Sequence, residues 1–160
     1  MTAPVPTPIG VGPAYHPPVL SRQVAAAATV GPFRCDSSRP RFGVHLELFA
    51  AGRVVIVPAG IGVAPPWRRD GAYVRSGRCS YAARTREPTG VIEVSRRGLR
   101  LADFFAIWGQ KLSRYRRAYV AGKRWPGQLG AIPLRPHAQI VLQVGTFVPP
   151  HATFLFRKGL

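Results

Sequence analysis

Acidic side chains are scarce in this chain, which has six Asp and Glu residues against 23 Lys and Arg. The six carboxylates are dispersed and form no pair at a spacing typical of general acid–base chemistry. The chain also has no Gly-x-Ser-x-Gly turn and no His next to a Cys. The sequence therefore argues against an enzyme, and we expect neither catalytic residues nor a cofactor.

Long apolar runs are missing too. No stretch approaches the roughly 18 apolar residues that a membrane-spanning helix needs. Met1 is followed by a proline-rich polar stretch, whereas a signal peptide begins with a basic region and then an apolar one. We expect a cytoplasmic protein, or one whose targeting segment lies outside this sequence.

Cysteine is limited to Cys35 and Cys79, which are 44 positions apart. Two cysteines allow one intrachain disulfide. Two buried free thiols are equally consistent with the sequence alone.

Positive charge is abundant, and the formal net charge is +17. Such a balance favours a polyanionic partner, either nucleic acid or an acidic protein. Coding bias is the competing explanation, because 20 of the 23 basic residues are Arg. Aromatic rings lie among the basic clusters, namely Trp67, Tyr115, Tyr119 and Trp125. These rings could stack bases, but they could equally anchor the chain to its core. The candidate anion-binding residues are Arg68, Arg69, Arg84, Arg86, Arg96, Arg97, Arg116, Arg117, Lys123 and Arg124.

Composition divides the chain into a proline-rich arm over residues 1–33 and a small domain over residues 34–160. We expect the arm to be disordered, because it has little to bury and proline cannot donate to a ladder. From Phe42 the apolar residues alternate with polar ones, which predicts a half-buried strand. Ala51-Gly52 then predicts a type I turn followed by a left-handed glycine, leading into a second strand over residues 53–57.

The remaining elements follow from the same reasoning. Residues 60–78 predict a long loop and residues 91–95 a strand. Residues 101–108 predict a short helix that ends at Gly109, because Leu101, Phe104, Phe105 and Trp108 share one face. The sequence AYVAGKRW predicts a second hairpin, residues 138–144 a strand, and VPPHATFLF an edge segment. The fold class expected is α+β, a β-dominated single domain with one short helix.

Several motifs resemble one family of small bacterial and archaeal proteins that are mostly extracytoplasmic and rich in histidine. The shared motifs are VPAGIG at 57–62, LADFFAIWGQ at 101–110, AIPLRPHAQIVLQVG at 131–145 and the terminal KGL. The resemblance covers about four fifths of the length. It implies the family's fold and an extracytoplasmic location, but no activity. It also implies that Cys35 and Cys79 lie close together, paired if the compartment is oxidising.

This chain departs from the family at the histidines. Family histidines would align with Gly43, His45 and Glu47, and with Arg84, Arg86 and Glu93, so that only His45 is retained. Alternating imidazoles on a strand can converge on a metal ion, but a guanidinium group offers no lone pair. The resemblance therefore implies a degenerate metal site in which an Arg–Glu cluster replaces the ligands, with Glu47 and Glu93 near the Arg pair.

A reduced metal site would use His45, Glu47 and Glu93, with Cys35 or Cys79 as a further candidate ligand. The competing interpretation is that His45 is a strand histidine satisfied by hydrogen bonds. His16 and His151 lie in proline-rich flanks without obvious companions, and His137 is expected to cap a turn.

The sequence thus favours a non-enzymatic binding or accessory domain with a basic surface for an anionic partner. Alternatives are a metal-handling domain around His45 and a structural subunit of a larger assembly. If carboxylates neutralise Arg84 and Arg86, replacing the pair should lower stability. If the pair faces solvent, replacing it should weaken anion binding.

Overall fold

A computed structural model describes residues 29–160 of the chain, so the prediction for residues 1–28 lies outside the described residues. The fold class is confirmed, because the described part is β-dominated and contains one α-helix. Its strands are β1 (Thr29–Val30), β2 (Phe33–Arg34), β3 (Phe42–Ala50), β4 (Arg53–Val55), β5 (Arg68–Asp70), β6 (Tyr73–Ser76), β7 (Ala83–Arg84), β8 (Val91–Val94), β9 (Arg117–Val120), β10 (Lys123–Arg124) and β11 (Gln139–Val144).

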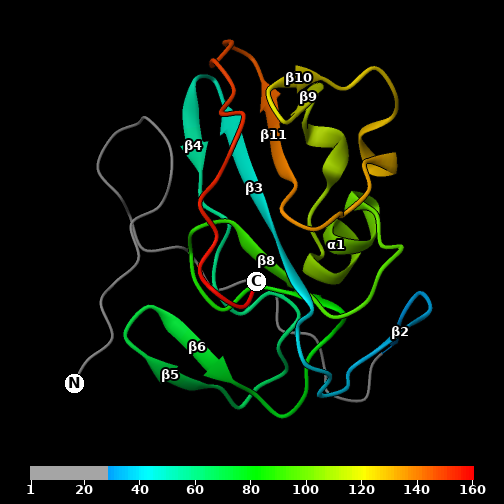
Figure 1. The fold of residues 1–160 in the computed structure, drawn as a ribbon, viewed down its shortest axis with the longest axis vertical. Helices are drawn as coiled ribbons and strands as arrows, with labels where there is room; N and C mark the ends of the chain where they lie inside the picture. Colours follow the sequence, from blue (N-terminus) through cyan, green and yellow to red (C-terminus); the bar gives the residue numbers. More distant parts are fainter. Residues whose placement is uncertain (1–28) are drawn as a thin grey trace.

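The main sheet is built around β3, its longest strand (Figure 1). Its order is β10-β9-β11-β3-β8-β7, and β4 also pairs with β3. The β3–β11 pair is parallel and the other pairs are antiparallel, with His45 opposite Gln139. β8 pairs with residues 42–45 of β3 and β4 with residues 48–50, so these two strands share one edge of β3.

One face of this sheet is the apolar core. Val44, Leu46 and Leu48 of β3 are buried there, as the alternation predicted. The prediction of a half-buried strand was wrong, because His45 and Glu47 on the other face of β3 are buried as well.

The α-helix α1 (Leu101–Trp108) packs against the apolar face of the sheet with Phe104 and other aromatic side chains, and it ends at Gly109, whose φ is 80°. The predicted helix face is therefore confirmed. No helix among residues 29–160 combines the length and apolar character needed to cross a membrane.

Both Ala-Gly turns differ from the type I turn expected of the first. Ala51 and Gly52 have φ angles of 51° and 75°, and Ala121 and Gly122 have 52° and 77°. Two positive φ angles in a two-residue loop are those of a type I′ turn. The prediction was wrong because this turn follows the right-handed twist of the paired strands, and that twist outweighs the local cost of a left-handed alanine.

Three further boundaries need correction. Residues 29–33, expected to be part of the disordered arm, lie in the β1–β2 hairpin, and Phe33 is buried in the core. The expected loop over residues 60–78 contains the β5–β6 hairpin, whose Val74 packs with Ala59 and Val63. Residues 145–160 form no edge strand. They run beside β3 in Figure 1 and cover the second face of the sheet through contacts described below.

Candidate anion-binding site

Arg84 and Arg86 meet at the same carboxylate. β7 pairs with β8 so that Arg84 lies opposite Glu93. Arg86 donates from Nε and Nη2 to Oε1 of Glu93 at 2.9 and 2.6 Å, and Nε of Arg84 lies 3.8 Å from Oε2. The Glu93 side chain is buried, and Arg157 donates to the same Oε1 at 2.8 Å. The expected Arg–Glu cluster therefore exists with Glu93 as its centre.

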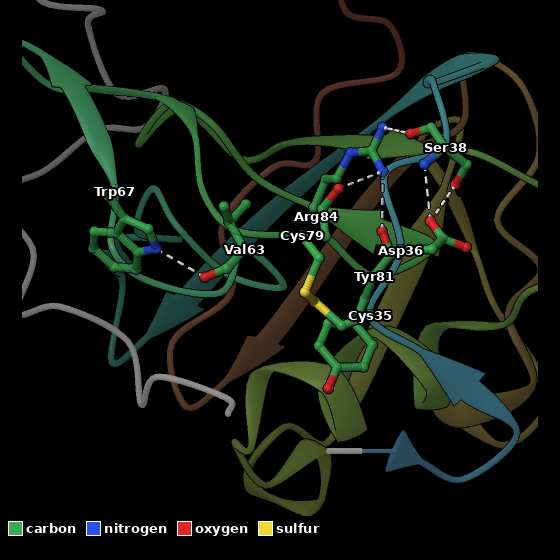
Figure 2. Close-up of a disulfide and its surroundings, with 9 residues drawn as sticks. Cys35, Asp36, Ser38, Val63, Trp67, Cys79, Tyr81 and Arg84 are labelled. Carbon is green, nitrogen blue, oxygen red and sulfur yellow. Dashed lines mark hydrogen bonds between the residues drawn. A yellow bond between two sulfur atoms is a disulfide. The ribbon is translucent and has the colours of Figure 1, made fainter. Parts of the chain in front are cut away.

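The guanidinium of Arg84 is held in the protein rather than in solvent, because the residue is only 5% exposed. Nη1 donates to Oγ of Ser80 at 3.0 Å and to the carbonyl of Tyr81 at 3.2 Å, and Nη2 donates to the carbonyl of Ser38 at 2.6 Å (Figure 2). Burial lowers the pKa of Arg84, while the charge of Glu93 opposes that shift. Arg84 thus ties residues 36–38 to β7.

A disulfide beside Arg84 fixes the same segment. The structure joins Cys35 to Cys79 with their Cα atoms 5.4 Å apart, as Figure 2 shows. Next to it the Asp36 amide donates to the Ser80 carbonyl at 2.8 Å. The Asp36 carboxylate accepts from the backbone N–H of Ser38 at 2.9 Å, and this bond lowers the pKa of Asp36. Residues 35–38 are therefore anchored to residues 79–84 by covalent and polar contacts.

A cavity of about 260 Å³ opens between these segments. One wall is the segment after Cys35, another is the end of β6, and the third is the Arg84–Arg86–Glu93 cluster. Its charged and hydroxyl-bearing lining residues are Ser37, Ser38, Arg39, Arg75, Ser76, Ser80, Arg84, Arg86 and Glu93. With four arginines and one carboxylate, this described lining carries a formal surplus of three positive charges. Such a cavity favours anions.

Sequence reasoning missed part of this lining. Arg39 and Arg75 line the cavity but belong to none of the doublets from which the basic clusters were chosen. Arg39 lies four positions after Cys35, so pairing Cys35 with Cys79 would have predicted that Arg39 lies near the residues around Cys79. Arg75 gave no signal, because the β5–β6 hairpin that carries it was not predicted.

Glu47 lies apart from the Arg pair, contrary to the expectation drawn from the resemblance. Its carboxylate accepts a hydrogen bond from Nδ1 of His151 at 2.9 Å and lies 3.8 Å from Nδ1 of His45. His151 therefore has a companion, which its proline-rich surroundings did not reveal. The separation arises because Glu47 lies beyond the residues of β3 that pair with β8, whereas Glu93 lies opposite Gly43.

The segment from Gly145 to the end covers the row Gly43–His45–Glu47 on the second face of the sheet. The Phe154 ring stacks on His45 with centroids 3.8 Å apart, and Phe156 lies over Gly43. A Cβ at Gly43 would come 2.9 Å from the Phe156 ring, so the close approach needs glycine there. Arg157 donates to Glu87 at 3.2 Å as well as to Glu93. The end of the chain thus completes the burial of this row.

His45 is fully buried and has hydrogen-bond partners on both nitrogens. Nε2 lies 2.8 Å from the Thr89 carbonyl and Nδ1 lies 2.6 Å from the Gln139 amide. Burial lowers the pKa of His45, which favours the neutral ring. A neutral ring has one N–H, and the Thr89 carbonyl accepts it, so Nδ1 must accept. The atom placed at Nδ1 is Oε1 of Gln139, and Nε2 of Gln139 has no partner among the described residues, so exchanging the two amide atoms would supply the donor that Nδ1 needs.

The metal hypothesis placed His45, Glu47 and Glu93 together, but the structure gives them different partners. Glu93 is bound by arginines, and His45 is satisfied by Thr89 and Gln139. Among residues 29–160, no three His, Cys, Asp or Glu side chains are grouped so as to hold a metal ion.

His137 has a φ of 62° in the turn before β11, and its Nε2 lies 2.5 Å from the Leu160 carbonyl.

The other candidate basic residues are dispersed. Arg68 and Arg69 lie on β5, Arg116 and Arg117 at the start of β9, and Lys123 and Arg124 on β10. β5 and β10 are at opposite ends of the molecule in Figure 1. Arg96 and Arg97 lie in the turn after β8, where Arg96 packs over the Phe33 ring at 4.6 Å. The structure therefore brings only Arg84 and Arg86 of the predicted set into the cavity.

The aromatic residues among the basic clusters mainly serve the core. Tyr115 is buried, and Trp125 packs against the core while its indole N–H donates to the Gln128 carbonyl at 2.9 Å. Trp67 donates to the Val63 carbonyl at 2.8 Å and packs beside the β5–β6 hairpin. Tyr119 lies between Arg124 and Phe147. Of these four residues only Tyr115 is buried, while Trp67, Tyr119 and Trp125 are each partly exposed, so stacking of bases on these three rings stays a prediction.

Comparison with protein-family models, with curated proteins and with solved structures finds no match. The resemblance to the histidine-rich family therefore stays a prediction.

Proposed function

We propose that this domain binds a phosphate-bearing polyanion, without catalysis, at the cavity between Ser38, Arg75 and Arg84. The observation that carries the proposal is the surplus of three positive charges in the lining of a single cavity. A large net charge can be spread over a surface by coding bias alone, but here arginines from three separate segments converge on one space.

The donors around the cavity favour phosphate over isolated carboxylates. Guanidinium groups and serine hydroxyls are among the usual partners of phosphate oxygens in nucleic-acid complexes. The cavity of about 260 Å³ has room for a phosphate group, and its described lining contains no aromatic ring on which a base could stack. We therefore expect contacts with the backbone of a nucleic-acid strand and little preference for sequence.

Arg39 and Arg75 are the residues with which to test the proposal. Arg39 is exposed, and Arg75 contacts residues outside the buried cluster, pairing with Asp70 and lying over the Tyr73 ring, so both can be replaced without disturbing that cluster. We expect Arg39→Gln with Arg75→Gln to weaken binding of a single-stranded oligonucleotide. The magnitude of the slope of log affinity against log salt should fall by about 1.4, since two fewer phosphates of the single strand are neutralised.

The matched control is Arg114→Gln with Arg116→Gln, which removes the same charge from exposed positions outside the cavity. Equal weakening by both pairs would assign binding to bulk charge and overturn the proposed site. Inorganic phosphate should compete with the oligonucleotide. Tighter binding of polyglutamate than of the oligonucleotide would instead identify an acidic protein as the partner and contradict the proposal.

A further inference from the structure

A second cavity, of about 350 Å³, lies between the turn after β8 and the segment before β11. Two stretches of backbone build it. The Leu134 amide donates to the Leu99 carbonyl at 2.9 Å, the Leu101 amide donates to the Ile132 carbonyl at 2.8 Å, and Arg100 bridges Pro133. In paired extended segments successive side chains point to opposite sides. Leu99 and Leu134 are accordingly buried while Arg100 and Arg135 are exposed.

The lining of this cavity combines apolar groups with positive charge. Its apolar members are Phe42, Leu99, Ala131, Pro133, Leu134 and Pro136. Its charged members are Arg97, Arg100 and Arg135, and the described lining contains no acidic residue. Within residues 29–160 none of these three guanidinium groups forms an ion pair. Asp103 directs its carboxylate to the backbone N–H of Arg100, at 2.8 Å.

The cavity is also accessible. A Cβ placed on Gly98 would meet no atom within 4 Å, so the turn that borders the cavity leaves space in front of it. Its volume of about 350 Å³ is within the range of small-molecule sites, which are mostly apolar with a few polar groups that orient the ligand.

We infer that this cavity binds a small amphipathic anion, with an apolar body against Ala131, Pro133 and Pro136 and an acidic head group on Arg97, Arg100 and Arg135. The inference is independent of the proposed polyanion site, because the two linings share no residue. The ligand is identified by having both a negative charge and an apolar chain. An alcohol of the same chain length lacks the charge, and a short acid lacks the apolar chain.

Calorimetry with octanoate, octyl sulfate, octanol and acetate tests this inference on the full chain. Both octyl anions should bind with one-to-one stoichiometry, and a preference between them distinguishes a carboxylate from a sulfate-type head group. Octanol should bind at least about tenfold more weakly, since a hydrogen bond to a charged group contributes that much or more. Acetate should also bind at least about tenfold more weakly, because it keeps the charge but lacks the apolar chain whose burial contributes to binding.

Two variants locate the site. The triple replacement Arg97→Gln, Arg100→Gln and Arg135→Gln should weaken octanoate binding at least tenfold. Ala131→Phe should also block it by filling the cavity without changing charge, because Ala131 is an exposed lining residue. The control triple Arg34→Gln, Arg53→Gln and Arg116→Gln removes equal charge from exposed residues elsewhere and should leave octanoate binding unchanged.

Three results would overturn the inference: octanol binding as tightly as octanoate, equal loss in the control triple, or octanoate binding unaffected by Ala131→Phe. Failure here is distinguishable from failure of the polyanion proposal. Arg39→Gln with Arg75→Gln should leave octanoate binding intact, and saturating octanoate should not displace the oligonucleotide.

Discussion

Arg84 and Arg86 are separated by one residue, yet their guanidinium groups lie in different surroundings. Arg84 is buried and its hydrogen bonds join two segments of backbone, whereas Arg86 reaches Glu93 from the edge of the cavity with 37% of its side chain exposed. Glu93 accepts from Arg86 and Arg157 and has Arg84 beside it. The like charges at these neighbouring positions are therefore compensated by one buried carboxylate.

Replacing Arg84 and Arg86 with alanine should lower the free energy of unfolding by about 3–5 kcal/mol, because a buried carboxylate would lose most of its compensation. Urea denaturation measures this loss. The exposed pair Arg114 and Arg116 serves as the control, and its double alanine variant should stay within about 0.5 kcal/mol of the wild type. An unchanged denaturation midpoint for the Arg84–Arg86 variant would show that the cluster is not structural.

His45 should make stability depend on pH. Burial lowers its pKa below the ordinary value of 6.5, so the unfolded chain takes up a proton at higher pH than the folded one. The stabilisation is present above pH 6.5 and is lost as the pH falls below it through the folded pKa. We expect melting temperatures to fall on acidification, and a smaller fall in His45→Gln. Equal slopes in both proteins would contradict this role of His45.

At the scale of elements, the segment over residues 145–160 acts as a cover although it has no regular secondary structure. Its alternate residues Phe154 and Phe156 stack on His45 and His137, and Leu155 between them is 92% exposed. This alternation resembles that of a strand, but the contacts are side chains laid on a sheet face rather than a backbone ladder.

Phe154→Ala should destabilise the protein by roughly 2 kcal/mol, less than a fully buried aromatic because Phe154 is half-buried. The neighbouring Leu155→Ala provides the control and should have little effect, since that side chain is almost fully in solvent. Thermal melts and limited proteolysis of the two variants measure the difference. Similar protease sensitivity in both would mean that the stack on His45 does not hold the segment.

The two Ala-Gly turns each contain a left-handed alanine that asparagine would tolerate better. Ala51→Asn and Ala121→Asn should each stabilise the protein by up to about 1 kcal/mol, because both positions are exposed. Ala106→Asn in α1 is the matched control and should cost about 0.5 kcal/mol through helix propensity. Lower melting temperatures in both turn variants would contradict the assignment of type I′ turns.

At the scale of the whole molecule, the disulfide joins the segment before β3 to the segment before β7. It closes a loop with a sequence separation of 44. That loop contains β3 with β4, and the β5–β6 hairpin. The cross-link therefore constrains a large part of the unfolded chain, in addition to fixing one wall of the arginine-lined cavity.

Cys35→Ser with Cys79→Ser should cost about 4 kcal/mol in the chain-entropy description of a loop of this length. Denaturation of the wild type with and without reductant measures the same contribution of the disulfide to the free energy of unfolding. The variant should also bind the oligonucleotide more weakly, because Ser38 and Arg39 follow the cross-link. If full reduction, verified by thiol titration, leaves the midpoint unchanged, the disulfide contributes nothing to stability.

Local patterns in the sequence predicted the elements that depend on residues close together in the chain. Alternation from Phe42 identified β3, the spacing of Leu101, Phe104, Phe105 and Trp108 identified the buried face of α1, and the Ala-Gly pairs identified two hairpins. Periodicity reports which side chains share a face because it depends on backbone geometry within a few residues. The turn type was missed because it depends on the twist of the paired strands.

Only the tertiary structure decided the partners of the buried charges. His45 meets Gln139 across a sequence separation of 94 and Glu47 meets His151 across 104, and no local pattern encodes either contact. The register of β8 on β3 placed Glu93 with the arginines and left Glu47 to His151. The charge and residue types came from the sequence, but their pairing depended on strand order and register, which are non-local properties of the sheet.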